Sequence, residues 1–474
     1  MGVNWRKPIM LGILKATKSP IPGELRLIRS LERKPGEEIL SLQNQRLSSL
    51  LQHAWQHTEY YNEVLSDCGV VRDGKVNLDR FEDIPFLTKD ILRDEADRLR
   101  AKKVPKGRTP YKDSSGGSTT GQPARFWQDS YYWDMNIANK LYHFEVLGKD
   151  LGDSEMKIWG SERDLTTGTI GFTAKLKNYI YNRRFEQCFH LPEEQVVSIV
   201  NDINRFKPKI IWTYRDGMDV IAGYILRNGL RPHSPVAIYA GGATLYPHIV
   251  ERIEKAFRAP VINFYGSREL GDVACQCEEK GGLHIASMFN KVEVIDEAGN
   301  TLVDEDGELV VTALMNYTMP FIRYRVGDMG KLTSASCPCG RGWPMLEHVS
   351  GRVVEVLINS KGDRIDPIYM LMVGSDAFAD SVQRYQIVQE ELARITVRSI
   401  LAPGVSQEQI QPQLKTIREK IRFLMGEDCV VDFEFVDDIP LTKSGKHPYI
   451  VRKVSLDGPA GVTDANDRPH GAVR

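Results

Sequence analysis

Hydrophobic residues recur at two different spacings along the chain, and each spacing predicts a type of element. Over residues 37–66 they follow the three- and four-residue spacing of an amphipathic helix or a pair of helices. A turn and a helix with Thr88 as its N-cap are predicted over 83–99. From 130 to 260, short apolar runs that end in glycine or polar residues alternate with helical stretches. Repeated strand and helix predict an α/β fold with a largely parallel sheet.

The pattern changes after residue 290. Short β-rich runs alternate there with Asp/Gly turns, which predicts a small antiparallel sheet or barrel. Beyond residue 357 we expect strands near 394–400 and 429–436 and a helix near 407–425. This last segment is predicted to be a separate α+β domain.

The length and composition fit a soluble protein with two domains. The 474 residues are enough for a large domain over 1–351, with parallel-sheet α/β subdomains and a small β-barrel-like subdomain, and a small one over 352–474. Hydrophobic residues are 42% and charged residues 26%, as in soluble globular proteins. Lys and Arg (62) nearly balance Asp and Glu (63), so no global field attracts nucleic acid or an anionic membrane.

The N-terminal apolar patch is short. Residues 9–16 read IMLGILKA, are broken by Lys15, and lack a small-residue cleavage site, so no signal peptide is predicted. We expect a helix packed on the body of the protein, with peripheral membrane contact as the lesser alternative. No stretch reaches the roughly 18 apolar residues of a membrane span. The cytoplasm is therefore the expected location.

A loop of small residues, DSSGGSTTGQPARF, spans 113–126. Its Gly116 and Gly121 have the spacing of a Walker loop, but Gln122 and Pro123 stand where lysine and a hydroxyl residue belong. Hydroxyls, backbone N–H groups and glycines can still cradle phosphate oxygens. The alternative is a flexible linker. The bulky apolar stretch that follows directly favours the phosphate site.

Further segments follow this loop in a fixed order, among them YGSREL (265–270), MPFIRYRVGD (319–328), SGR (350–352) and IPLTKSGKHP (439–448). With IPFLTKDILRD (84–94) upstream and CPCGRGWP (337–344), the sequence resembles the adenylate-forming superfamily of acyl- and aryl-CoA synthetases. It resembles most closely the phenylacetate–CoA ligase branch and its capsular-polysaccharide-biosynthesis relatives. The resemblance spans nearly the whole chain.

The resemblance implies a reaction in two halves. A carboxylic acid attacks the α-phosphate of ATP, with Mg²⁺ as a cofactor, and the acyl-adenylate then passes its acyl group to coenzyme A. The first alternative keeps the adenylation but transfers the acyl group to an amine, a hydroxyl or a carrier protein. A non-catalytic nucleotide-binding homologue is the third reading. No nucleic-acid partner is expected, and a homodimer is left open.

The resemblance also assigns roles to individual residues. Asp328 matches the carboxylate that binds both ribose hydroxyls, and Arg352 matches an arginine that contacts the nucleotide. Glu269 matches the acidic residue that helps to bind Mg²⁺. Tyr265, followed by Gly266, resembles the residue that stacks on adenine. The positions that match the phosphate loop and the loop beside the purine are Ser115, Gly116, Gly117, Ser118, Thr119, Thr120 and Gly121, and Gly241, Gly242 and Ala243.

Lys446, in the segment LTKSGKHP, matches the catalytic lysine of the C-terminal domain, with Lys443 as its competitor. It would neutralise charge between the carboxylate and the α-phosphate. In the family this small domain is mobile and rotates between the half-reactions. The hinge is expected near 353–355, where the sequence departs from the family pattern. The phosphate loop is also one residue longer, which leaves open which hydroxyl contacts phosphate.

The seven cysteines are unevenly placed. Cys68, Cys188 and Cys429 are isolated and are interpreted as buried small hydrophobes. The others form two C-x-C pairs, which a metal site in a reducing compartment explains better than disulfides do. We expect structural Zn²⁺ with metal-free thiols as the alternative, because C-x-C pairs with a nearby histidine suit tetrahedral zinc. The predicted ligands are Cys277, His284, Cys337 and Cys339, with Cys275 as the alternate to Cys277.

The acyl pocket is the least specified part of the site. Trp159, Tyr214 and Phe264 are candidates for it, with core packing as the alternative. Arg323 and Arg325 are interpreted as structural partners of nearby carboxylates.

Overall fold

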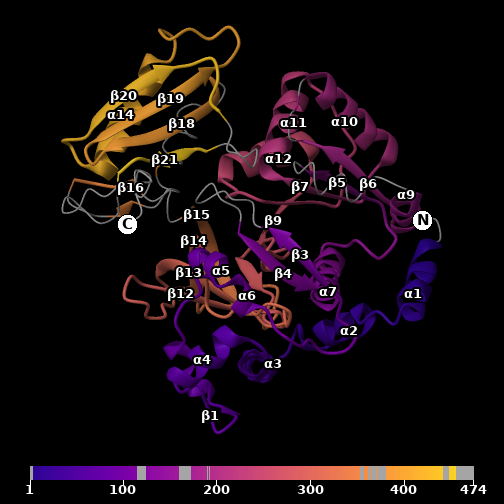
Figure 1. Ribbon diagram of the computed structural model, residues 1–474. Coiled ribbons are helices and arrows are strands. Elements are labelled where there is room, and N and C mark those ends of the chain that lie inside the picture. Colours follow the sequence, from indigo (N-terminus) through magenta and orange to yellow (C-terminus); the bar gives the residue numbers. More distant parts are fainter. Residues whose placement is uncertain are drawn as a thin grey trace, which may run out of the picture. The chain divides into compact units, whose positions relative to one another are not determined.

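The computed structural model describes residues 4–114, 124–159, 172–188, 191, 193–352, 357–360, 364–365, 370, 381–440 and 448–454. The chain forms two compact units whose boundary lies between Gly351 and Arg352 (Figure 1). Among the described helices, none combines the length and the hydropathy that a membrane span requires.

Helices dominate the first hundred residues. The helices predicted over 37–66 are confirmed as α3 (Gly36–His57) and α4 (Glu59–Asp67). The Thr88 hydroxyl accepts a hydrogen bond from the Ile91 N–H at 3.2 Å, so the predicted N-cap is confirmed. The elements of this region are α1 (Arg6–Ala16), α2 (Ile21–Leu31), α3, α4, β1 (Val71–Arg72), β2 (Lys75–Val76), the 3₁₀ helix η1 (Leu78–Asp83), α5 (Lys89–Asp94) and α6 (Ala96–Leu99).

A hairpin and a long helix follow. Strands β3 (Pro110–Ser114) and β4 (Arg125–Asp129) pair antiparallel. Helix α7 (Ser130–Val146) begins where β4 ends, because Asp129 accepts a hydrogen bond from the Tyr132 N–H at 2.9 Å. This cap fixes the point at which the chain turns from strand into helix.

Five parallel strands form one half of an 11-stranded sheet, in the order β6-β5-β7-β8-β9. The predicted α/β fold is therefore confirmed. The strand order reverses at β5, because β6 lies on one side of it and β7 on the other. Figure 1 shows α10, α11 and α12 grouped beside these strands. The elements are β5 (Glu155–Trp159), α9 (Phe172–Tyr181), β6 (Arg183–Gln187), α10 (Glu193–Phe206), β7 (Ile210–Tyr214), α11 (Arg215–Arg227), β8 (Ala237–Gly241), α12 (Pro247–Phe257) and β9 (Val261–Ser267).

The antiparallel strands expected after residue 290 continue this same sheet rather than forming a separate one. Strand β9 pairs antiparallel with β10, and from there the order is β10-β11-β15-β14-β13-β12. Strand β15 thus lies between β11 and β14, although it comes last in sequence. The strands are β10 (Gly271–Gln276), β11 (Leu283–Ile285), β12 (Asn290–Ile295), β13 (Asp306–Ala313), β14 (Tyr324–Thr333) and β15 (Met345–Arg352).

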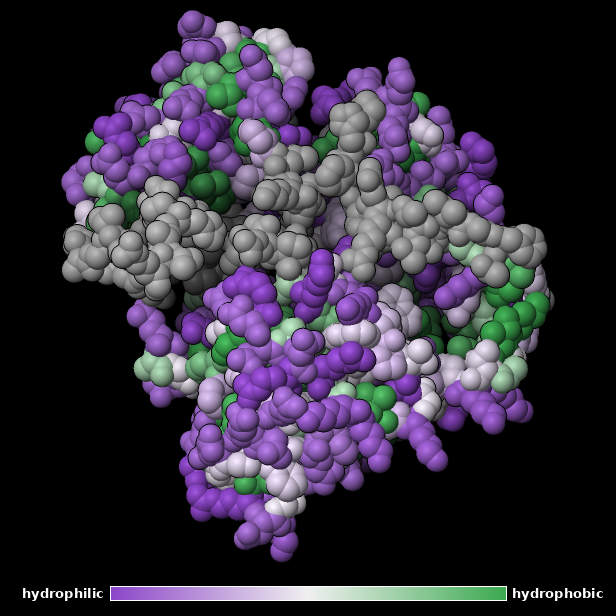
Figure 2. Space-filling model, viewed as in Figure 1, coloured by the Kyte–Doolittle hydropathy of each residue, from purple (hydrophilic) through white to green (hydrophobic). Residues whose placement is uncertain are grey.

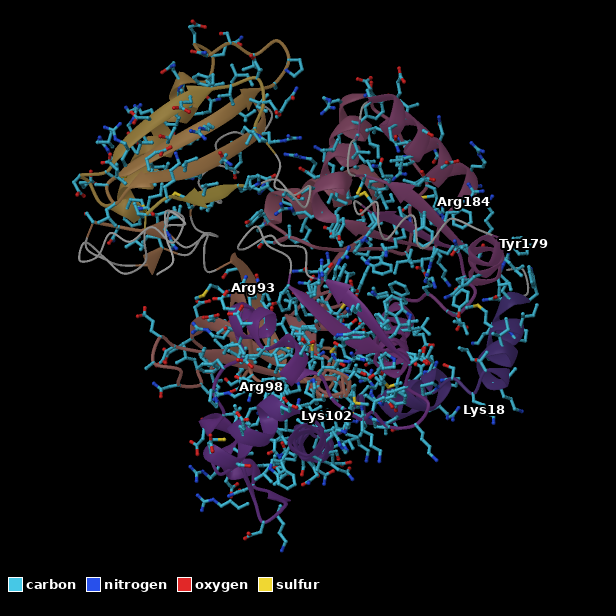
Figure 3. All side chains as sticks on the ribbon, viewed as in Figure 1. Lys18, Arg93, Arg98, Lys102, Tyr179 and Arg184 are labelled. Atoms are coloured by element: carbon cyan, nitrogen blue, oxygen red, sulfur yellow. The ribbon has the colours of Figure 1, made fainter. Side chains whose placement is uncertain are left out.

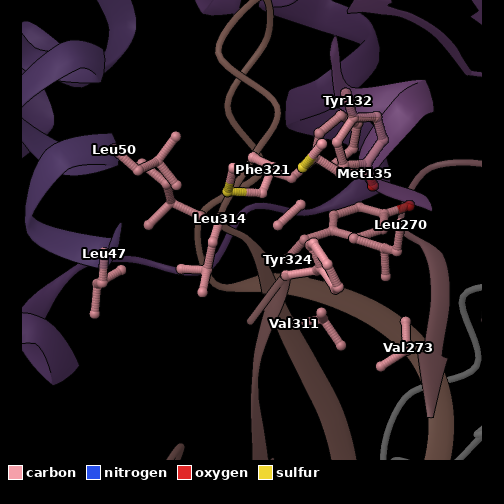
Figure 4. Packing of buried hydrophobic residues seen from close by; sticks show 14 of the residues in the cluster. Leu47, Leu50, Tyr132, Met135, Leu270, Val273, Val311, Leu314, Phe321 and Tyr324 are labelled. Carbon is pink, nitrogen blue, oxygen red and sulfur yellow. The ribbon is translucent and has the colours of Figure 1, made fainter. Parts of the chain in front are cut away.

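The largest hydrophobic core joins the N-terminal helices to this antiparallel half (Figure 4). Leu47 and Leu50 of α3 pack in the same cluster as Tyr132 and Met135 of α7. The strand side of the cluster is formed by Leu270, Val273, Val311, Leu314, Phe321 and Tyr324. The turn between β9 and β10 is therefore anchored on a rigid core.

The second unit is the predicted α+β domain. Its main sheet has the order β20-β19-β18-β21, in which β18 and β19 are antiparallel and the outer pairs are parallel. The strands and the helix predicted here are confirmed. Its elements are β16 (Leu357–Ile358), β17 (Arg364–Ile365), β18 (Val382–Glu391), β19 (Arg394–Leu401), α14 (Gln411–Met425), β20 (Val430–Phe435) and β21 (Ile450–Arg452).

Candidate functional site

Four parallel strands end at the same edge of the sheet, and several candidate residues lie there. Trp159 ends β5, Tyr214 ends β7, and Gly241 ends β8 directly opposite Tyr214. Tyr265 lies near the end of β9. In open α/β sheets, ligands bind at the carboxyl ends of strands where the strand order reverses. The reversal at β5 therefore makes this edge the candidate ligand site.

The glycine pair Gly241–Gly242 brings backbone very close to two aromatic rings. A Cβ on Gly241 would lie 2.6 Å from the Phe264 carbonyl oxygen and 2.8 Å from its ring. Gly242 has a φ of +81°, and a Cβ there would fall inside 3.0 Å of the Tyr214 ring carbons Cδ1 and Cε1. Space thus requires glycine at position 241, and both space and backbone conformation require it at position 242. Ala243, half-buried, follows the pair.

Tyr265 and Asp328 are brought together from opposite halves of the sheet. The Tyr265 hydroxyl on β9 donates a hydrogen bond to Oδ2 of Asp328 on β14 at 2.8 Å. Both side chains are half-buried. A carboxylate has about four acceptor positions, so this bond orients Asp328 and leaves acceptor capacity for further donors.

Glu269 lies in the tight turn between β9 and β10, and its side chain is buried. Its backbone carbonyl accepts hydrogen bonds from Gln128 Nε2 at 3.1 Å and from the Tyr132 hydroxyl at 3.2 Å. A Cβ on Gly266 would clash with the Gly271 carbonyl across the hairpin. The glycine therefore lets the hairpin close, while β4 and α7 hold the turn that carries Glu269.

The three aromatic candidates for the acyl pocket belong to one cluster. Trp159 stacks on Tyr214 with ring centroids 3.8 Å apart, and Phe264 stacks on Tyr239 at 4.4 Å. All lie in or against the same hydrophobic core. The Lys140 ammonium lies 3.6 Å from the centroid of Trp212 in this cluster.

Three cysteines and a histidine converge next to β10 and β11. One ligand atom each from Cys277, His284, Cys337 and Cys339 lies within 4.8 Å of all the others. The Sγ atoms of Cys277 and Cys337 are 3.6 Å apart, and Cys339 Sγ is 3.4 Å from His284 Nε2. Burial lowers the pKa of His284, which keeps the imidazole neutral. Burial raises the pKa of Cys277 to about 12.

Cys275 does not join this group. It pairs with His284 across β10 and β11, but its side chain packs in the aromatic cluster with Phe264 and Tyr239. Its Sγ donates to the Gln276 carbonyl at 3.2 Å. Gly281 lies so close to Cys337 that a Cβ would be 3.2 Å from its Sγ.

Comparisons with known sequences find similarity to CapK and to phenylacetate-coenzyme A ligases. The CapK C-terminal domain family matches residues 357–453. Protein CapK of Staphylococcus aureus is 26% identical over 425 residues, which cover 88% of this chain and 90% of that protein. A phenylacetate-coenzyme A ligase of Aromatoleum evansii is 27% identical over 444 residues, which cover 87% and 93%. The chain is homologous to phenylacetate–CoA ligases and CapK.

A solved structure has the same fold as this chain. A crystal structure of 2-hydroxyisobutyryl-CoA ligase in the postadenylation state, in complex with R3-HIB-AMP, superposes with a TM-score of 0.73. The superposition covers 89% of this chain and 91% of the ligase chain, at 18% sequence identity. The fold is thus that of adenylate-forming ligases, and the resemblance indicated by the sequence motifs is confirmed.

Several predicted site residues lie outside the described residues. These are Ser115–Gly121 of the phosphate loop, Lys443 and Lys446, and the hinge at 353–355. Arg352 is the last residue of β15, and only its backbone is described. The described part of the site therefore comprises the purine, ribose and Mg²⁺ candidates.

The sequence analysis missed Tyr324 at this site. Its hydroxyl is buried and has no hydrogen-bond partner among the described residues. Burial, together with the carboxylates of Glu269 and Asp328, raises its pKa well above the usual range. Tyr324 and Asp328 are both on β14, but the pairing with β13 is irregular between Arg325 and Met329, and Gly327 has a φ of +82°. Simple strand alternation therefore gave no signal for Tyr324 in the sequence.

Two arginines in the same segment are structural, as predicted. Arg323 is buried and its Nη2 lies 3.0 Å from Glu293 Oε1. Arg325 forms an ion pair with Glu308 on β13.

Proposed function

We propose that this protein is an AMP-forming carboxylate ligase that adenylates an acyl or aryl acid with ATP and transfers it to coenzyme A. The observation that carries the proposal is the hydrogen bond from Tyr265 on β9 to Asp328, next to the strand that ends in Gly241, at the edge where the parallel strands end. The homology to phenylacetate-coenzyme A ligases supports the reaction class.

In this proposal the candidate residues that the structure describes bind the nucleotide or its Mg²⁺ ion. Asp328, oriented by Tyr265, accepts hydrogen bonds from the ribose hydroxyls, and the Tyr265 ring stacks on adenine beside Gly241 and Gly242. Glu269 would hold Mg²⁺, a hard cation that prefers carboxylate and phosphate oxygens and would neutralise charge on the departing pyrophosphate. The buried position of Glu269 supports this role, because a buried carboxylate needs a charged or hydrogen-bonding partner.

Lys446 is assigned to the adenylation step, and Ser115–Gly121 to the β- and γ-phosphates. Bringing a carboxylate to a polyphosphate joins two anions, so the site must supply positive charge. If Lys446 serves only this step, Lys446→Ala will abolish pyrophosphate release but still transfer the acyl group from a preformed acyl-adenylate. Loss of both half-reactions in a folded Lys446→Ala protein would refute the assignment, as would unchanged pyrophosphate release.

We further propose that Cys277, His284, Cys337 and Cys339 hold a structural Zn²⁺. Tetrahedral zinc with Zn–S bonds of about 2.3 Å and a Zn–N bond of about 2.0 Å separates two sulfurs by about 3.8 Å, and sulfur from nitrogen by about 3.5 Å. The distances of 3.6 Å between the Cys277 and Cys337 sulfurs and 3.4 Å between Cys339 Sγ and His284 Nε2 fit these separations. The Arg341 N–H donates to Cys339 Sγ at 3.5 Å, a bond that stabilises a thiolate ligand.

A pair of matched cysteine variants tests the zinc site. We expect one zinc per chain by metal analysis in the parent and in Cys275→Ser, whose side chain lies in the aromatic cluster. Cys337→Ser should lose the metal and unfold at a lower temperature. A parent that carries no zinc, with Cys337→Ser as stable as the parent, would exclude the site. Reduced thiols in this arrangement fit a cytoplasmic location, which is part of the proposal.

The decisive experiment for the reaction is pyrophosphate release from ATP with a panel of aryl, acyl and amino acids, each with and without coenzyme A. Release that depends on one acid and yields its thioester would support the full proposal. Acid-dependent pyrophosphate release without formation of a thioester with coenzyme A would support adenylation. It would indicate that the acyl acceptor is an amine, a hydroxyl or a carrier protein. No release with any acid, from protein that binds ATP, would favour the non-catalytic reading.

A further inference from the structure

Helix α1 presents apolar side chains to solvent. It buries Met10 and Leu14, whereas a surface helix of a soluble protein normally exposes polar residues. Ile9 and Ile13, one helical turn apart, are 44% and 39% exposed. Trp5, directly before the helix, is 44% exposed. The outer side of α1 is thus apolar over most of its length.

Helix α9 extends this apolar surface. Its Leu176 and Tyr179 are 47% and 61% exposed. The rings of Trp5 and Tyr179 lie 6.3 Å apart, and Arg6 Nε donates to the Tyr179 carbonyl at 3.2 Å. Figure 2 shows hydrophobic residues gathered on the surface over α1. We call Trp5, Ile9, Ile13, Leu176 and Tyr179 the α1–α9 patch.

Basic side chains flank the α1–α9 patch, and few acidic residues lie near it. Residues 1–23 contain no Asp or Glu, and neither does α9. The nearby carboxylates of Asp150 and Asp134 are engaged with Lys7 and Ser19. Figure 3 labels Lys18 and Tyr179, near the two ends of α1. In and directly after α1, and in α9, the exposed lysines that form no ion pair with another described residue are Lys15, Lys18, Lys175 and Lys177.

We propose that the α1–α9 patch docks the protein on an anionic membrane surface. Exposed apolar and aromatic side chains flanked by lysines are the composition of helices that lie in the headgroup region. Trp and Tyr favour this region because their rings are amphipathic. The whole chain has a net charge of −1, so the attraction is local, acting within the roughly 8–10 Å over which salt screens charges.

Charge complementarity favours lipid over a second copy of this chain. A two-fold dimer through the patch would place the same surface on both sides of the interface. Lys15, Lys18, Lys175 and Lys177 would then face their own copies, and like charges brought together oppose association. Anionic headgroups instead offer the opposite charge to all four. Docking does not depend on the proposed ligase reaction, because it needs neither ATP nor acid.

Vesicle sedimentation with the full chain tests the proposal. The probes are vesicles of phosphatidylcholine alone and of equal parts phosphatidylcholine and phosphatidylglycerol, at low and at high salt. We expect binding to the mixed vesicles only, weakened by salt. The double variant Lys15→Gln with Lys18→Gln should reduce the partition coefficient about 30-fold. Each lysine near an anionic surface contributes about 1 kcal/mol, and a loss of about 2 kcal/mol corresponds to this factor.

A second variant tests the apolar contribution. Ile9→Gln with Ile13→Gln should reduce binding by about tenfold or more, because buried apolar area drives insertion. Leu230→Gln, 40% exposed elsewhere in the same unit, is the matched control and should bind like the parent. Circular dichroism verifies that each variant is folded.

Three results would overturn the proposal. They are equal affinity for both kinds of vesicle, failure of the parent to bind either kind, and a dimer in solution that Ile9→Gln with Ile13→Gln dissociates. The last result would assign the patch to a second copy of the chain.

Discussion

Replacing Gly242 with alanine tests how closely the backbone at the end of β8 approaches the aromatic cluster. The residue has a φ of +81°, which costs an alanine about 1–2 kcal/mol. The added Cβ would also overlap the Tyr214 ring, which stacks on Trp159 at 3.8 Å. Moving that ring forfeits an aromatic pair of about 0.5–1.5 kcal/mol. We therefore expect Gly242→Ala to lower the free energy of unfolding by about 1.5–3.5 kcal/mol.

Gly148→Ala is the matched control. Gly148 has a φ of +87°, and a Cβ there would have no atom within 4 Å. Its cost should be the backbone cost alone, about 1–2 kcal/mol. All seven tryptophans lie before residue 352, so urea unfolding followed by tryptophan fluorescence reports on the large unit.

Activity separates the two variants further. Gly242→Ala should reduce acid-dependent pyrophosphate release at least about tenfold, because a displaced Tyr214 disturbs the edge at which substrates must be aligned. Gly148→Ala, which follows α7, should keep the parent rate. Equal destabilisation by the two variants, or full activity in Gly242→Ala, would refute the close approach as the reason for glycine at this position.

Three further changes have defined outcomes. Tyr265→Phe should raise KM for ATP about tenfold, because the Asp328 carboxylate loses its orienting hydrogen bond; unchanged KM would exclude that role. Thr88→Ala should lower the free energy of unfolding by about 0.5–2 kcal/mol in urea, whereas Thr88→Ser keeps the cap. Burial alone would raise the pKa of Glu155, but Arg183 and Lys149 outweigh it and hold the pKa at about 2. The stabilisation is thus complete above the ordinary pKa of 4.5 and is lost as the pH falls toward 2, so the destabilisation by Glu155→Gln in urea titrations should shrink over that range.

Local sequence patterns were sufficient to predict much of the fold. The spacing of apolar residues in 37–66 predicts the helix pair because each helix needs only one apolar face. Thr88 was recognisable because an N-cap bonds within three residues of itself. The parallel strands were recognisable from short apolar runs between helices.

Long-range pairing was not recoverable in the same way. The position of β15 between β11 and β14 depends on which strands meet after distant segments fold. The sequence also did not predict that the parallel and antiparallel halves form one sheet, because this depends on the pairing of β9 with β10. No local pattern encodes such neighbours.

At the candidate metal site, local sequence patterns likewise could not decide which of two cysteines is a ligand. C-x-C spacing left Cys275 and Cys277 as alternates, because strand alternation alone puts them on one face. Cys275 lies within β10, whereas Cys277 follows its last residue, Gln276, so the chain has left the strand before the second cysteine. The end of β10 is set by its pairing with β9 and β11.

The place of β15 in the sheet has a consequence for how the protein acquires its fold. Strands β12, β13 and β14 form a local meander, and β10 with β11 forms a local hairpin. Among the described strands, β15 alone pairs with both groups, and it begins more than fifty residues after β11. Until residues 345–352 arrive during synthesis, β11 and β14 each present an unpaired edge, the kind of surface that promotes aggregation. Completion of the large unit is therefore a late, high-contact-order event, and chains interrupted before β15 are the ones most dependent on chaperones.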